Sequence, residues 1–174
     1  MPAYHSSFNS ESERQICGLA LVPLKTKAKG PAPVERDPAK EDIIDEALNF
    51  FKANVLFRNF EVQGPGDRVL IYLTLYITAC LQKLQNTDKN AAEKVLFQLA
   101  IENFAIPGDR NFALGGFVTN PANRGEADSV RQYLTQLRQE CGLRLIERVF
   151  AQDPSNPSKW WLCFSKRKFL NKTL

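Results

Sequence analysis

Apolar side chains recur every three or four residues over several stretches of the chain, which is the spacing of amphipathic helices. The first predicted helix begins near Asp42, where clustered acidic residues suit the positive end of a helix dipole, and fades before the turn at 64–66. The second runs from about Arg68 to Leu84, with Asp67 as its expected N-cap. Because apolar residues cover nearly its whole circumference, we expect this helix at the centre of the fold.

Further helices are predicted from about Ala91 to Ile101 and over 127–150. In the second of these, Gly142 interrupts the apolar stripe, so it either separates two helices or bends one. A short helix is expected after Pro157, a residue that suits the first turn. Between the two longer helices, residues 103–125 are loop-like yet rich in large apolar side chains, and they either pack on the protein's own core or face a partner.

The N-terminal part of the chain, residues 1–39, lacks helical periodicity. Ile16–Val22 is typical of a short strand or an extended segment laid over the core, and Pro23 stops any helix there. Because other strand signals are sparse, we predict an all-α fold. It would be a single irregular helical domain over residues 1–174, with a largely extended N-terminal segment (1–39) and a long apolar loop.

The C-terminal segment, residues 159–174, is aromatic and basic. The whole chain has a net charge of +4, and this segment alone holds five basic residues and no acid. Its candidate partner-interface residues are Trp160, Trp161, Lys166, Arg167 and Lys168. Such residues suit a protein-binding anchor, base stacking on nucleic acid, or acidic lipid headgroups. The alternative is that both tryptophans pack in the core and the cations are merely solvated.

Residues for catalysis, cofactor binding or metal binding are not grouped in any recognisable motif. The single histidine, His5, lies in the irregular N-terminal part. None of the four cysteines forms a Cys-x-x-Cys pair, which disfavours a metal cluster: Cys17, Cys80, Cys141 and Cys163. They are expected to be free thiols, because the absence of a secretory signal predicts a reducing compartment. We therefore predict no catalytic residues, no cofactor and no metal. An enzyme that uses His5 or a cysteine is the least favoured hypothesis.

Targeting signals and membrane spans are not expected either. The polar segment Met1–Arg14, with two glutamates, does not fit a secretory signal. The apolar run Val69–Leu81 is too short to cross a bilayer, so we expect it to be a buried helix. These features predict an intracellular protein that is not inserted in a membrane.

Several segments, taken in order, resemble subunit 3 of the actin-related protein 2/3 complex, the nucleator of branched actin filaments. The resemblance extends from end to end. The matching segments include Pro2–Ser7, Lys29–Pro33, Asp42–Ala47 and Leu70–Ile77. The strongest matches are Tyr133–Phe150, with Gln136–Leu145 at its centre, and Pro157–Trp161.

This resemblance implies a mainly helical, non-catalytic structural subunit that binds no nucleotide and packs beside actin-related protein 3. It implies the other subunits of the complex as partners, and actin filaments through the complex. It also implies a place in the cytoplasm with the actin cytoskeleton, at cortical actin and in cell projections. The alternative, from the residues alone, is a small module that binds acidic lipid or nucleic acid through segment 159–174. With the resemblance, we expect no nucleic-acid partner.

Overall fold

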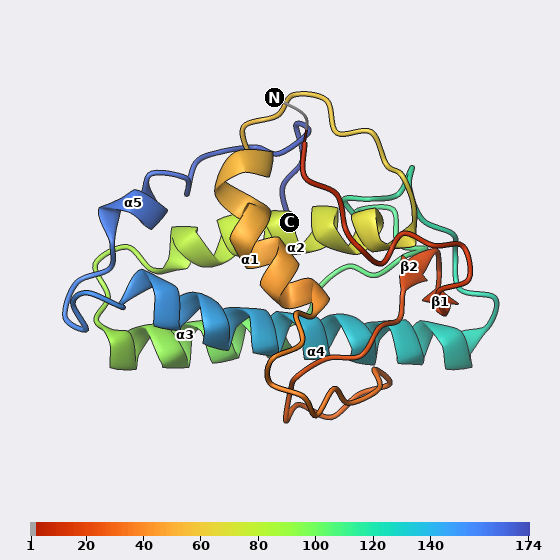
Figure 1. Cartoon of the computed structure of the whole chain (residues 1–174), viewed down its shortest axis with the longest axis horizontal. Coiled ribbons are helices and arrows are strands. Elements are labelled where there is room, and N and C mark those ends of the chain that lie inside the picture. Colours follow the sequence, from red (N-terminus) through yellow and green to blue (C-terminus); the bar gives the residue numbers. More distant parts are fainter. Residues whose placement is uncertain (1–2) are drawn as a thin grey trace.

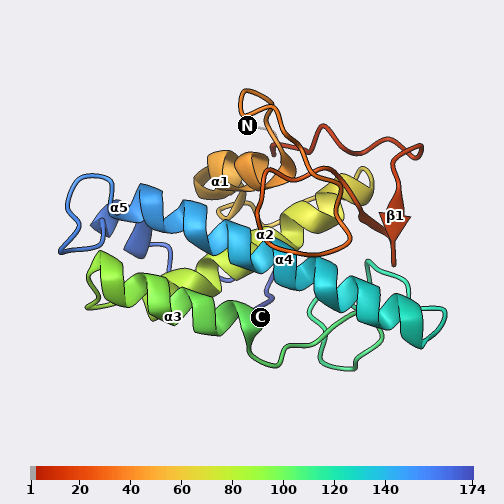
Figure 2. The same ribbon diagram turned by 90° about the horizontal axis from the view of Figure 1, so that it is seen from below.

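Helices and one short hairpin form the regular structure of residues 3–174, which are the residues that the computed structural model describes. The helices are α1 (Ile43–Asn54), α2 (Pro65–Lys83), α3 (Lys89–Ile101), α4 (Arg124–Val149) and α5 (Lys159–Leu162). The strands are β1 (Gln15–Ile16) and β2 (Leu19–Ala20). Helices α3 and α4 lie side by side, and α1 and α2 cover them on one side (Figure 1; Figure 2).

The helix starts follow the local sequence closely, with one exception. Helix α1 begins where predicted, and Asp42 caps it: its side chain accepts from the Asp45 backbone N–H while the Asp45 side chain accepts from the Asp42 N–H. The expectation for Asp67 is wrong: α2 already begins at Pro65, and Asp67 lies in its first turn. Proline at the first helical position loses no hydrogen bond, which explains the earlier start.

Helix α4 is one continuous helix that passes through Gly142. Of the two predicted alternatives, it is therefore not divided at this residue. The glycine lies where α3 packs on α4, and a Cβ placed there would meet the Cβ of Leu96 at 3.5 Å. The gap in the apolar stripe thus marks a helix contact and not a helix end.

The all-α prediction is wrong, because residues 15–20 form an antiparallel hairpin in a structure that is 43% helical. Ile16 pairs with Leu19, so only Cys17 and Gly18 make the turn. Both have positive φ angles, 54° and 83°, as the tight turns that match strand twist require. A cysteine in this conformation is uncommon, which is why the turn left no clear signal in the sequence.

The described part of the N-terminal segment, residues 3–39, contains the hairpin, turns and irregular structure but no helix, and two buried carboxylates hold its start in place. Glu46 of α1 accepts hydrogen bonds from the Ser6 hydroxyl (2.7 Å) and from the Ser7 backbone N–H (2.9 Å). Asp67 of α2 accepts from the Ser6 backbone N–H at 2.9 Å. The segment runs so close to α2 that a Cβ on Gly66 would lie 2.6 Å from the Ser6 Oγ. Glycine is therefore needed at this contact.

Of the stretch 103–125 that was expected to be a loop, residues 103–123 contain no helix or strand, whereas 124 and 125 already belong to α4. Much of this loop packs on the protein's own core. Ile106, Phe112 and Leu114 are all buried. The Phe112 ring stacks on Tyr72 of α2, with ring centroids 6.0 Å apart. Packing on its own core, one of the two alternatives, is thus what the apolar residues of this loop mainly do.

Candidate interaction surfaces

The two neighbouring tryptophans of α5 lie in different environments. Trp161 is 8% exposed and stacks on Phe51 of α1, with ring centroids 5.9 Å apart and the ammonium of Lys52 4.3 Å above the Trp161 ring. Trp160 is 67% exposed, with the ammonium of Lys159 5.6 Å from its ring. Consecutive helical residues do not face the same side, which explains the difference. Trp161 therefore joins α5 to the core, whereas Trp160 is accessible to a partner.

The basic run of the C-terminal segment lines an open groove with a volume of about 650 Å³. Lys166, Arg167 and Lys168 form one side, and Arg58 and the half-exposed Leu56 contribute from the segment after α1. The described lining holds four cations and no acidic residue. It contains neither tryptophan, so the five candidate residues do not form one continuous site. The groove is suited to an acidic surface.

A second groove, between α3 and α4, was missed in the sequence. It has a volume of about 260 Å³ and is mostly apolar; Phe97 and Leu143, which line it, are 60% and 59% exposed. Phe97 directly follows Leu96, which is buried on the inner face of α3, so Phe97 has to point to another side of the helix. This position of a large apolar residue was the one sign of the groove in the sequence. Exposed apolar residues gathered in a groove favour protein contacts.

A charged cluster joins the start of α1 to α4 and to the N-terminal segment. Arg144 donates to both carboxylate oxygens of Asp42, at 2.7 and 2.8 Å, and to the Lys25 backbone carbonyl at 2.6 Å. It also pairs with Asp45 at 3.0 Å and Glu140 at 3.5 Å. Burial opposes ionisation of Asp42, but the hydrogen bonds from Arg144, Lys25 and Asp45 outweigh it and lower the pKa of Asp42. This cluster stabilises the fold.

Most of the nucleophile candidates are buried in the fold: Cys17, Cys80 and Cys141 are buried, whereas Cys163 is exposed. Burial, aided by Glu126, raises the pKa of Cys17 to about 12, and burial also raises the pKa of Cys80 to about 12. At neutral pH both are thiols, the less reactive form. The His5 Nδ1 lies 2.6 Å from a carboxylate oxygen of the buried Asp67, where it helps to hold the N-terminal segment.

Residues 3–174 contain neither a metal-binding group nor a membrane-spanning helix. No group of three or more His, Cys, Asp or Glu residues in this range is arranged to hold a metal ion. Within the same range, the helices are too short or too polar to span a membrane.

A buried core and surface grooves of apolar and basic character define a class of protein: a mainly helical protein suited to binding other proteins. Comparison with known proteins identifies its family. The chain belongs to the P21-Arc family, the ARP2/3 complex ARPC3 (21 kDa) subunit, whose family model matches residues 1–174. Of the segments that carry the resemblance, only Pro2 lies outside the described residues.

Individual relatives match over nearly their full length. The chain is 62% identical to actin-related protein 2/3 complex subunit 3 of Dictyostelium discoideum, over 98% of this chain and 99% of the relative. It is 49% identical to subunit 3 of Schizosaccharomyces pombe, over 100% of both chains. It is 43% identical to subunit 3 of Arabidopsis thaliana, over 97% of both chains. The family resemblance noted in the sequence is thus confirmed.

Proposed function

We propose that this chain is a non-catalytic structural subunit of an actin-related protein 2/3 complex, in which it supports the nucleation and branching of actin filaments. The observation that carries the proposal is the end-to-end match to subunit 3 chains from amoeba, fission yeast and plant. Its partners are the other subunits, with actin-related protein 3 beside it, and actin filaments through the assembly. It works in the cytoplasm with the actin cytoskeleton, at cortical actin and in cell projections.

The structure supports this proposal through the surfaces that it leaves open. The apolar groove with Phe97 and Leu143, the exposed Trp160, and the basic groove with Lys166–Lys168 lie on different elements. Several separate contact surfaces suit a protein that touches more than one neighbour. A continuous cluster of buried side chains from the N-terminal segment to Phe169 supports the action of residues 1–174 as one domain.

The alternative function, binding of acidic lipid or nucleic acid through segment 159–174, gains no support from the relatives, which are all named as subunits of the complex. The two hypotheses differ in their dependence on salt. Binding to a nucleic acid through cations weakens steeply as salt rises, whereas incorporation through apolar surfaces persists at moderate salt.

A pull-down of the tagged full chain from cell extract at moderate salt tests the proposed function. We expect both actin-related proteins and the remaining subunits to co-purify in equal amounts, as identified by mass. Recovery of the chain alone, or with nucleic acid or lipid, would contradict the proposal. The double variant Phe97→Ser and Leu143→Ser, at two exposed positions, should reduce co-purification without lowering the melting temperature if the apolar groove is a docking surface.

The two tryptophans provide a matched pair of variants for the C-terminal segment. Trp161→Ala should cost about 3–5 kcal/mol of stability, because it removes a buried ring stacked on Phe51. Trp160→Ala should leave the free energy of unfolding within about 0.5 kcal/mol of wild type, because the side chain is exposed. If Trp160 contacts a partner, its variant should instead co-purify less of the complex. Unchanged stability and unchanged assembly for both variants would remove this segment from the interface.

A further inference from the structure

Arg138 of α4 is a buried cation without an acidic partner. Its side chain is 4% exposed, and among residues 3–174 no carboxylate oxygen lies within 4.0 Å of its guanidinium nitrogens. It donates to the Leu99 backbone carbonyl at 2.6 Å and to the Tyr72 hydroxyl at 3.3 Å. Its Nε has no hydrogen-bond partner, and neither does the buried hydroxyl of Tyr76. Two residues that line the same cavity therefore each carry a buried polar atom without a hydrogen-bond partner.

The groups around Arg138 offset only part of this charge. Its guanidinium carbon lies 4.6 Å from the ring centroid of Tyr76 and 4.2 Å from that of Phe104, so both faces are covered by aromatic rings. The Leu99 carbonyl belongs to the last turn of α3, the negative end of that helix dipole. Partial charges and ring quadrupoles do not neutralise a full charge, and arginine does not lose its proton in proteins. Buried charges are normally paired.

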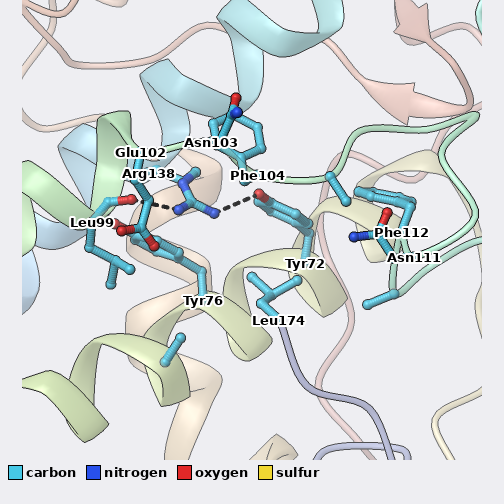
Figure 3. Close-up of a pocket in the computed structure, with 13 residues that line it drawn as sticks. Tyr72, Tyr76, Leu99, Glu102, Asn103, Phe104, Asn111, Phe112, Arg138 and Leu174 are labelled. Carbon is cyan, nitrogen blue, oxygen red and sulfur yellow. Dashed lines mark hydrogen bonds between the residues drawn. The ribbon is translucent and has the colours of Figure 1, made fainter.

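The guanidinium lines a half-enclosed cavity of about 250 Å³ (Figure 3). Tyr72, Phe104 and Phe112 are the aromatic residues of the lining near Arg138, and Asn111 is a polar one. Figure 3 shows these side chains gathered around one space between α2, the end of α3 and the 103–125 loop. A dry cavity of about 150 Å³ holds a benzene molecule, so this volume accommodates one ring with a carboxylate.

We propose that this cavity is a binding site for a carboxylate group carried on a small apolar or aromatic body, with Arg138 as the residue that recognises the charge. A carboxylate matches the planar guanidinium and would provide the missing countercharge. The aromatic lining suits the apolar remainder of the ligand. Phosphate fits less well, because a doubly charged tetrahedral anion requires more donors than one arginine and gains nothing from aromatic walls.

The sources of such a group are a free small organic acid or an acidic side chain of a neighbouring subunit. Both present the same chemistry to Arg138. Titrations of the free chain and of the assembled complex distinguish these two sources, because a side chain of another subunit would fill the cavity only in the complex.

Two exposed residues of the lining allow the site to be altered without touching the core. Glu102, which follows α3, lies in the lining beyond 4.0 Å from Arg138 and competes electrostatically with an incoming anion. Asn111 lies in the lining on the side of the loop. Glu102→Gln should therefore strengthen carboxylate binding, and Asn111→Asp should weaken it. Each effect should be about threefold, the interaction of unit charges roughly 7 Å apart in water.

The experiment is a calorimetric titration of the full chain with benzoate, its neutral analogue benzamide, and inorganic phosphate at constant ionic strength. We expect saturable benzoate binding at one site, at least tenfold weaker binding of benzamide and of phosphate, and the two opposite shifts in the variants. Arg138→Gln should abolish the preference for benzoate over benzamide. The wild-type comparison holds even if that variant fails to fold, and it does not depend on the proposed assembly.

Equal binding of benzoate and benzamide, no binding of either, or unchanged affinity in both surface variants would overturn the proposal. A Glu102→Gln variant that melts at a clearly lower temperature and still binds no benzoate would also overturn it, because Glu102 would then be the partner of Arg138. The same titration on the assembled complex identifies the source. Retained binding indicates a free acid, and lost binding indicates an acidic side chain already in the cavity.

Discussion

Arg138 and Arg144 lie less than two turns apart on α4, yet one has acidic partners and the other has none. Arg144 makes a bidentate pair with Asp42 and contacts two further carboxylates, and it joins three parts of the chain. Arg138 is more deeply buried and has aromatic rings, a hydroxyl and a backbone carbonyl around it, but no carboxylate. Burial alone therefore does not define the role of an arginine. The presence or absence of a countercharge does.

The largest expected difference comes from removing the paired arginine. Arg144→Ala should lower the free energy of unfolding by about 3–5 kcal/mol, because it leaves the buried carboxylate of Asp42 without its partner. Urea denaturation of the full chain measures this. Arg148→Ala, further along α4 with one exposed hydrogen bond to Asn49, is the matched control and should change stability by less than about 0.5 kcal/mol. Equal effects of the two variants would show that the Asp42 pair adds nothing.

Acidification should lower the free energy of unfolding through the Asp42–Arg144 pair, by less than the Arg144→Ala substitution does. The pKa of Asp42 is lowered below its ordinary 3.8 in the folded chain, so the unfolded state binds protons first as the pH falls. The stability that this pair contributes is therefore fully present above about pH 4 and is lost as the pH falls through the lowered pKa. Asp42→Asn, which keeps an N-capping side chain, should remove this part of the pH dependence. Parallel slopes below pH 4 in the two proteins would contradict the assignment.

The smallest effect is expected at the unpaired arginine. Arg138→Met removes a buried, uncompensated charge, and this gain is offset by the loss of the hydrogen bonds to the Leu99 carbonyl and the Tyr72 hydroxyl. We expect the free energy of unfolding to stay within about 1 kcal/mol of wild type, measured in the same urea titrations. A loss as large as that of Arg144→Ala would show that the ring contacts and the Leu99 carbonyl make Arg138 as important to the fold as Arg144.

The sequence was sufficient to place the helices but not the contacts that join distant segments. Helical periodicity and caps such as Asp42 are local properties, so α1, α3 and α4 start within a few residues of their predicted positions. The hairpin was not predicted because its turn depends on a positive φ at Cys17. Cysteine rarely adopts that conformation, so the residue type gives no sign of it. Burial of Glu46 beneath Ser6 and Ser7 depends on residues about forty positions apart.

The candidate surfaces were predictable only in part, for the same reason. Exposure of the run Lys166–Lys168 follows from its charge, and the different environments of Trp160 and Trp161 follow from their adjacency on a helix. The lack of an acidic partner for Arg138 cannot be read from its neighbours in sequence. It depends on the whole fold, which places no carboxylate of the described residues beside the guanidinium. The apolar groove at Phe97 likewise required the packing of α3 on α4 to be known.

The attachment of the N-terminal segment to α1 and α2 has a consequence for the order of events on the ribosome. The backbone N–H of Ser6 is buried and bonds to Asp67, sixty-one residues later, so this contact cannot form until α2 has been synthesised. Residues at the start of the chain therefore dock late, after a costly loop closure. In the finished protein, the Ser6 amide should exchange with solvent deuterium only when the segment detaches from both helices, which makes it a single-residue reporter of that opening.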